Sequence, residues 1–156
     1  MLFLAIFGKN VEDAFGHLRY LAFYVAGGFV AIMTQAAVTL LFGTAAAGRV
    51  PNLGASGAIA AVLGAFFVLY PTARIRTLVF VFFLQIPAWV YLGGWFLYQL
   101  VEGNFGLASA SANGGGVAFF AHVGGFVFGV LVALALLNAG RVVPQTPQRR
   151  AALAPF

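Results

Sequence analysis

The sequence predicts an all-α membrane protein, a polytopic bundle of four transmembrane helices preceded by a partial span. The 156-residue chain is 63% hydrophobic and 7% charged, and its mean hydropathy is +1.02. Soluble domains carry about 25% charged residues. Long apolar runs alternate with short polar or glycine-bearing junctions. Lys and Arg gather at every second junction, as expected for a chain that crosses a bilayer several times.

The first half of the chain contains one complete predicted span. Residues 1–7 are apolar but too short to cross a bilayer, so they resemble the end of a span. Residues 8–17 form a polar junction, where we expect Glu12 to pair with Arg19 in a structural ion pair. Residues 18–42 form a full span of about 25 residues, which is long enough to cross with some tilt.

The second half contains three more predicted spans. The apolar run 57–70 is about 14 residues, or roughly 21 Å as a helix. Because a hydrocarbon core is about 30 Å thick, the start of this helix should lie below the outer surface. Residues 77–101 form the next span, which Pro87 should kink. Residues 117–137 form the last one.

The distribution of basic residues predicts the orientation. One side receives seven of the eight Lys and Arg residues, namely Lys9, Arg19, Arg74, Arg76, Arg141, Arg149 and Arg150. The other side receives Arg49 alone. The positive-inside rule therefore places the C-terminus in the cytoplasm of a multi-pass cell-membrane protein. We expect residues 1–140 to form one intramembrane domain and residues 141–156 a disordered basic cytoplasmic tail. The net charge of +5 is explained by topology, so no nucleic-acid partner is expected.

Ser56 is the first candidate for chemistry, because it stands where a polar loop enters the short helix. The first N–H groups of a helix have no intrahelical partner, and the helix dipole makes that end slightly positive. Gly54, Ala55 and Gly57 surround the serine and form the expected site loop. Backbone N–H groups placed there can stabilise a developing oxyanion.

His122 is the second candidate, because an ionisable residue inside a span is costly and usually functional. Counted from the inner ends of their helices, Ser56 and His122 lie at about the same depth, roughly 21–22 Å. Gly125 and Gly129 share one helix face with His122 and should allow close helix contact. Such contact predicts a Ser–His dyad, since a serine hydroxyl needs a base to become a nucleophile.

Simpler interpretations remain open for each residue. A serine beside glycines also occurs at helix caps, and a lone intramembrane histidine can be a packing residue. No buried carboxylate is available as a third member, so a dyad is the most that the titratable residues permit. Trp89 and Trp95 are expected to be packing or interface residues. A small transporter or channel is disfavoured, because the sequence shows neither an internal repeat nor intramembrane acids.

Three motifs resemble the rhomboid family of intramembrane serine proteases, over nearly the whole chain. They are GASG at 54–57, AHVGGFVFG at 121–129 and FGKNVEDAFG at 7–16. The resemblance implies a rhomboid-like helix bundle that cleaves transmembrane protein substrates within the lipid bilayer. It implies Ser56 as nucleophile, His122 as general base, and no metal or cofactor.

The resemblance also implies a departure at the N-terminus. The family has a first span, and a His and an Asn on the second span that help to bind the oxyanion. These would precede Met1, so we expect the chain to be an N-terminally truncated rhomboid. It is then either a fragment of an active-type protease or a catalytically inactive protein that binds transmembrane clients.

Overall fold

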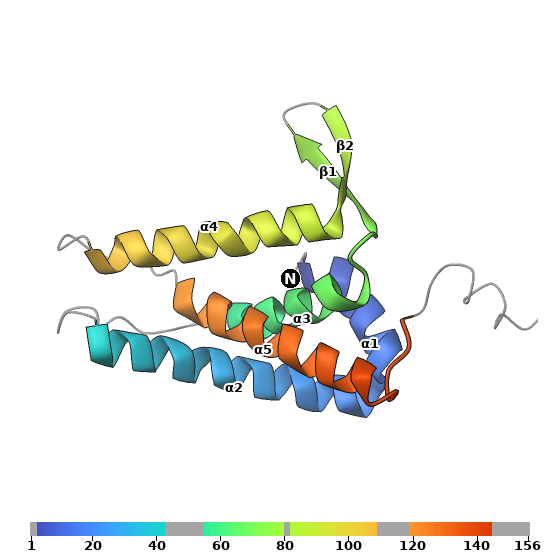
Figure 1. The fold of residues 1–156 in the computed structure, drawn as a ribbon, viewed down its shortest axis with the longest axis horizontal. Helices are drawn as coiled ribbons and strands as arrows, with labels where there is room; N and C mark the ends of the chain where they lie inside the picture. The colour runs from blue at the N-terminus through green and yellow to red at the C-terminus, as the bar shows by residue number, and fades with distance from the viewer. Residues whose placement is uncertain (1–2, 43–54, 80–81, 109–118, 145–156) are drawn as a thin grey trace, which may run out of the picture.

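The computed structural model describes residues 3–42, 55–79, 82–108 and 119–144 (Figure 1). Its elements in chain order are the π-helical turn η1 (Leu4–Gly8), α1 (Lys9–Phe15), α2 (His17–Phe42), α3 (Ser56–Leu69), β1 (Arg74–Val79), β2 (Phe82–Pro87), α4 (Ala88–Ala108) and α5 (Phe119–Asn138). Helices therefore dominate the described chain, with a single two-stranded sheet beside them.

α3 lies at the centre of the bundle, in contact with α2, α4, α5 and η1 (Figure 1). Ten of its 14 residues are buried, as expected for a helix that is apolar on every face. At its C-terminal end, the Phe66 ring meets Phe7 edge to face, with centroids 4.9 Å apart. α2 and α4 run in one direction and α3 and α5 in the other, so α3 and α5 are parallel neighbours.

Two of the described helices, α2 and α5, are long and apolar enough to cross a membrane. α3 is a shorter apolar helix. α2 buries only three residues and exposes large apolar side chains such as Leu21 and Phe29 on its outer face. A face of this kind belongs against lipid or another protein. The predicted total of four spans and a partial span remains a prediction.

The predicted span over residues 77–101 is wrong in its first half. Residues Arg74–Val79 and Phe82–Pro87 form an antiparallel hairpin that projects from the bundle, and α4 begins only at Ala88 (Figure 1). This segment is rich in β-branched and aromatic residues, which favour strands. Pro87 consequently does not kink a helix; it ends β2, and α4 starts immediately after it.

The first polar junction also differs from expectation. Residues Lys9–Phe15 are helical, and Gly16 turns the chain into α2 with a φ of 80°, a conformation that favours glycine. Glu12 pairs with His17, whose Nδ1 lies 2.6 Å from the carboxylate, so the predicted Glu12–Arg19 pair is wrong. Arg19 instead donates a hydrogen bond to the Arg141 carbonyl, 3.3 Å away.

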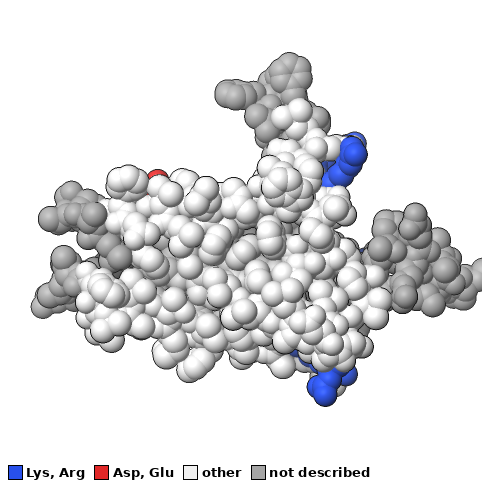
Figure 2. Space-filling view, in the orientation of Figure 1, with Lys and Arg blue, Asp and Glu red and all other residues white. Residues whose placement is uncertain are grey.

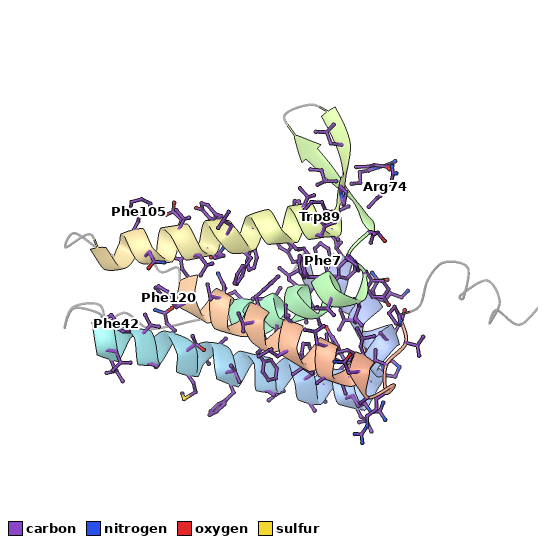
Figure 3. The ribbon with its side chains drawn as sticks, in the orientation of Figure 1. Phe7, Phe42, Arg74, Trp89, Phe105 and Phe120 are labelled. Atoms are coloured by element: carbon purple, nitrogen blue, oxygen red, sulfur yellow. The ribbon has the colours of Figure 1, made fainter. Side chains whose placement is uncertain are left out.

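Arg19 lies where α2 begins, next to Arg141, which follows the end of α5. Arg74, on β1, lies at the same end of the molecule (Figure 3). We call this the basic end, and blue Lys and Arg side chains gather there in Figure 2. Phe42 and Phe105 lie at the opposite end, and both side chains are largely exposed (Figure 3). The chain beyond α5 begins packed against the bundle, because Val142 is buried. Most of the predicted tail, residues 145–156, falls outside the described residues.

Candidate functional site

Ser56 is the first residue of α3. Ala55 precedes it as the N-cap, with φ −75° and ψ 7°, and its carbonyl accepts the Ile59 N–H at 3.0 Å. The N–H groups of Ser56, Gly57 and Ala58 therefore have no acceptor within the helix. The Ser56 residue is exposed at this helix start. Gly54, the remaining member of the predicted site loop, lies outside the described residues.

His122 lies in the first turn of α5, and a side chain from α2 holds this turn in place. The Gln35 Oε1 accepts the Ala121 N–H at 3.1 Å. That N–H is one of those left without a partner at a helix start, so Gln35 acts as a cap supplied by another helix. The position of His122 is consequently tied to α2 as well as to α5.

Glycines bring the backbones of α3 and α5 together just beside these two residues. A Cβ placed on Gly125 would overlap the Gly57 carbonyl oxygen, and one on Gly129 would overlap that of Ala61. A Cβ on Gly57 would lie 3.6 Å from the Ala121 carbonyl oxygen. Ser56 precedes Gly57, and His122 follows Ala121. The packing therefore brings the starts of the two parallel helices to one level.

The two side chains are not joined directly. Within residues 3–42, 55–79, 82–108 and 119–144, no hydrogen bond links Ser56 to His122. The His122 Nδ1 lies instead 3.0 Å from Oε1 of Gln99, on α4. Gln99 is only 5% exposed and is the one buried polar side chain in the described part of the chain. His122 therefore contacts an amide that the sequence analysis did not single out.

Trp95 also contacts the histidine. Its ring centroid lies 5.8 Å from that of His122, with the planes inclined by 41°. Trp95 and Gln99 are four residues apart on α4, and so present the same face to α5. Trp95 is expected to be a packing or interface residue, and a residue against which its ring packs is His122, the candidate base. Trp89 is 56% exposed, at the start of α4.

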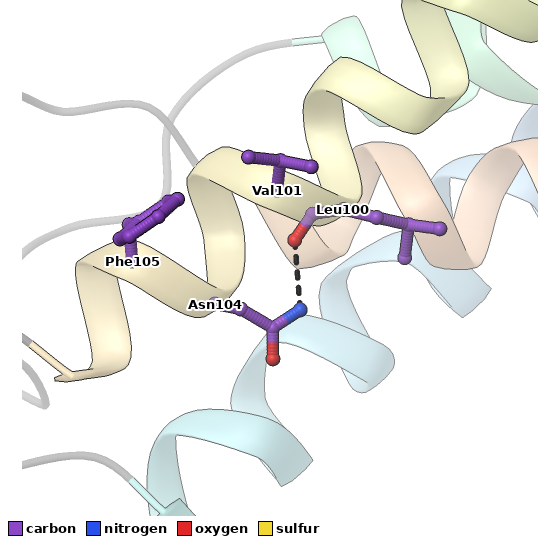
Figure 4. A pocket seen from close by; sticks show the side chains of 4 residues that line it. All are labelled: Leu100, Val101, Asn104 and Phe105. Atoms are coloured by element: carbon purple, nitrogen blue, oxygen red, sulfur yellow. Dashed lines mark hydrogen bonds between the residues drawn. The ribbon is translucent and has the colours of Figure 1, made fainter.

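A pocket of about 410 Å³ lies elsewhere on α4 (Figure 4). The described residues that line it are Leu100, Val101, Asn104 and Phe105. Asn104 is the one polar side chain among them, and its Nδ2 donates to the Leu100 carbonyl at 2.7 Å. The pocket thus offers apolar surface rather than chemistry. The described residues also contain no group of three or more His, Cys, Asp or Glu side chains placed to hold a metal.

The amino-acid sequence of the chain is similar to a known protein family and to a curated relative. The Rhomboid domain family matches residues 1–139. The chain is 31% identical over 150 residues to rhomboid protein 1, mitochondrial, of Saccharomyces cerevisiae. The alignment covers 96% of the chain but 39% of the yeast protein, so the chain spans well under half the length of that relative. No solved structure matches the chain.

Proposed function

Because the chain belongs to the rhomboid family, we propose that it is an intramembrane serine endopeptidase that uses Ser56 as nucleophile and His122 as general base. The observation that carries the proposal is the backbone packing of Gly57 against Gly125, which sets the starts of α3 and α5 side by side. Ser56 then stands at a helix start with free N–H groups, and the histidine stands on the adjacent helix.

The proposed reaction follows from these groups. The His122 Nε2 takes the Ser56 hydroxyl proton as Oγ attacks the carbonyl carbon of the scissile peptide. The Ser56 backbone N–H stabilises the resulting oxyanion. His122 then protonates the leaving amine, and a water molecule, activated by the same imidazole, hydrolyses the acyl-enzyme. Hydrogen bonds between catalytic groups are often long without substrate, so a bond from Ser56 to His122 is expected to form on binding.

The proposed setting is the lipid bilayer, with transmembrane protein helices as substrates. α2 and α5 would cross the membrane, and the basic end, with the C-terminus, would face the cytoplasm. Ser56 and His122 lie toward the opposite end, where α3 and α5 begin. Cleavage would therefore occur nearer the non-cytoplasmic surface.

A catalytically inactive rhomboid-like protein that binds transmembrane clients is the second candidate. It is favoured by the lack of a hydrogen bond between Ser56 and His122 among the described residues. This candidate predicts that clients crosslink to the protein and survive uncut, and that crosslinking persists in Ser56→Ala.

Labelling with a fluorophosphonate probe separates the two candidates. We expect the purified full chain in detergent to be labelled, and Ser56→Ala to lose all labelling, because the probe reacts only with an activated serine. His122→Ala should lower labelling at least 100-fold, the usual lower bound for loss of a general base. Ser109→Ala, the same chemical change at another serine, serves as the matched control and should label like the wild type. Wild-type protein that stays unlabelled while it crosslinks clients would favour the inactive candidate.

A further inference from the structure

Gln99 occupies an unusual position for an uncharged amide. It is nearly fully buried between α4 and α5, and its carbonyl oxygen lies 3.0 Å from Nδ1 of His122. Burying an amide oxygen without a partner costs free energy, and the imidazole supplies a partner for the Gln99 carbonyl oxygen. The same bond acts on the imidazole, whose chemistry depends on which ring nitrogen carries the proton.

The amide oxygen can only accept a hydrogen bond, so Nδ1 must be the nitrogen that donates. A neutral imidazole has one N–H, and the other nitrogen then holds a lone pair. With its proton on Nδ1, His122 has that lone pair on Nε2. The indole of Trp95, whose centroid is 5.8 Å from the histidine ring, bounds the imidazole on its α4 side.

We infer that Gln99 is a positioning residue that holds His122 as the Nδ1–H tautomer and leaves Nε2 available to take the Ser56 proton. The inference rests on the proposed function. α4 thereby contributes to the general base, because its Gln99 determines which nitrogen of His122 carries the proton.

The proton balance is simple. During attack the Ser56 Oγ proton moves to Nε2, which gives an imidazolium with an N–H on both nitrogens. The Nδ1–H stays on the imidazole and continues to donate to the Gln99 oxygen, and the amide itself takes no proton. When the amine leaves, the Nε2 proton goes to it, and the starting tautomer returns.

The tautomer of His122 is directly measurable by ¹⁵N NMR of the full chain labelled at histidine. The sequence contains two histidines, and His17→Gln leaves His122 as the only signal. In this background, at a pH at which the ring is neutral, we expect the Nδ1–H pattern. Gln99→Met should convert part or all of the signal to the Nε2–H form. Gln99→Glu keeps an acceptor and should retain Nδ1–H.

Kinetics then connect the tautomer with catalysis. For cleavage of a transmembrane substrate in liposomes, Gln99→Met should lower kcat roughly 10-fold or more with little change in KM, since part of the general-base effect is lost. Gln99→Glu should recover most of that loss. Gln85→Met, the same change at an exposed hairpin position, is the matched control and should behave like the wild type.

The possible outcomes separate this inference from the proposed function. An Nε2–H tautomer in the protein with Gln99 intact would overturn the role of Gln99 even if no variant folds. Equal fluorophosphonate labelling of wild type and Gln99→Met, with an unchanged tautomer, would also overturn it while the protease proposal stands. Wild-type protein without Ser56 labelling would overturn the protease proposal and, with it, the importance of the Gln99 contact for catalysis.

Discussion

Gly129 lies at a close approach of α5 to α3, and its missing side chain sets that distance. A Cβ there would overlap the Ala61 carbonyl oxygen and lie 2.8 Å from the carbonyl carbon. These are backbone atoms of a buried helix, so they cannot move aside without shifting α3. We therefore expect Gly129→Ala to destabilise the bundle by roughly 1–3 kcal/mol, the usual cost of overpacking. The measurement is thermal unfolding in detergent, followed by circular dichroism.

Gly94→Ala is the matched control for this prediction. Gly94 also lies inside a helix, α4, but a Cβ there would meet no atom within 4 Å. Alanine is favoured over glycine in a helix by about 1 kcal/mol, so Tm should stay the same or rise. An equal fall in Tm for both variants would show that the α3–α5 contact does not limit stability.

At the scale of single residues, the sequence alone indicates two site residues, Ser56 and His122, but not the buried amide of Gln99. Ser56 stands out because it lies where a polar loop enters an apolar helix, and His122 because it is ionisable inside an apolar span. The sequence does not indicate Gln99 as a site residue, because Gln99 is uncharged and lies near the end of the predicted span 77–101. The helix in fact begins at Ala88 and continues to Ala108, so Gln99 lies near its middle.

At the scale of elements, the Gln35 cap joins α2 to the first turn of α5. Its oxygen accepts the Ala121 N–H, and its Nε2 donates to the Thr39 hydroxyl at 3.2 Å. Gln35→Met should therefore loosen that turn. A typical hydrogen bond contributes about 1 kcal/mol, so amide exchange around Ala121 should speed up about fivefold.

Hydrogen exchange followed by mass spectrometry tests this, with Gln35→Glu as the control. A glutamate keeps an acceptor for the Ala121 N–H, and we expect exchange near the wild-type rate. The C-terminal turn of α5, ending at Asn138, provides an internal reference that neither variant should affect. Exchange at Ala121 that stays unchanged in Gln35→Met would show that the cap does not hold the turn.

The hairpin illustrates which elements a sequence pattern predicts poorly. α2, α3 and α5 follow from long apolar runs with clear ends, and their observed bounds fall within about two residues of those expected, the usual variation at helix ends. Residues 78–84 are also apolar, but a short apolar run does not by itself distinguish a strand from a helix. The β-branched and aromatic content of the run and Pro87 at its end were the signals for a strand.

At the scale of the whole molecule, the asymmetric placement of charge predicts how the bundle sits in a membrane. Thr72, in the turn after α3, and Val143, after α5, lie at the basic end, and both are exposed. Asn104 lies near the other end, on α4, and is also exposed. We therefore expect Thr72 and Val143 to face the cytoplasm, and Asn104 to face the opposite side.

Single cysteines test this arrangement without background, because the chain contains none. Thr72→Cys and Val143→Cys should react with a membrane-impermeant maleimide only after the cells are opened, and Asn104→Cys should react in intact cells. The unmodified chain is the matched control and should not react at all.

Labelling of Val143→Cys and Asn104→Cys from the same side would mean that α4 and α5 do not both cross the bilayer. Reaction of Thr72→Cys and Val143→Cys in intact cells, with Asn104→Cys protected, would invert the orientation. Ser56 and His122 would then lie nearer the cytoplasmic surface, and substrates would be cut on that side.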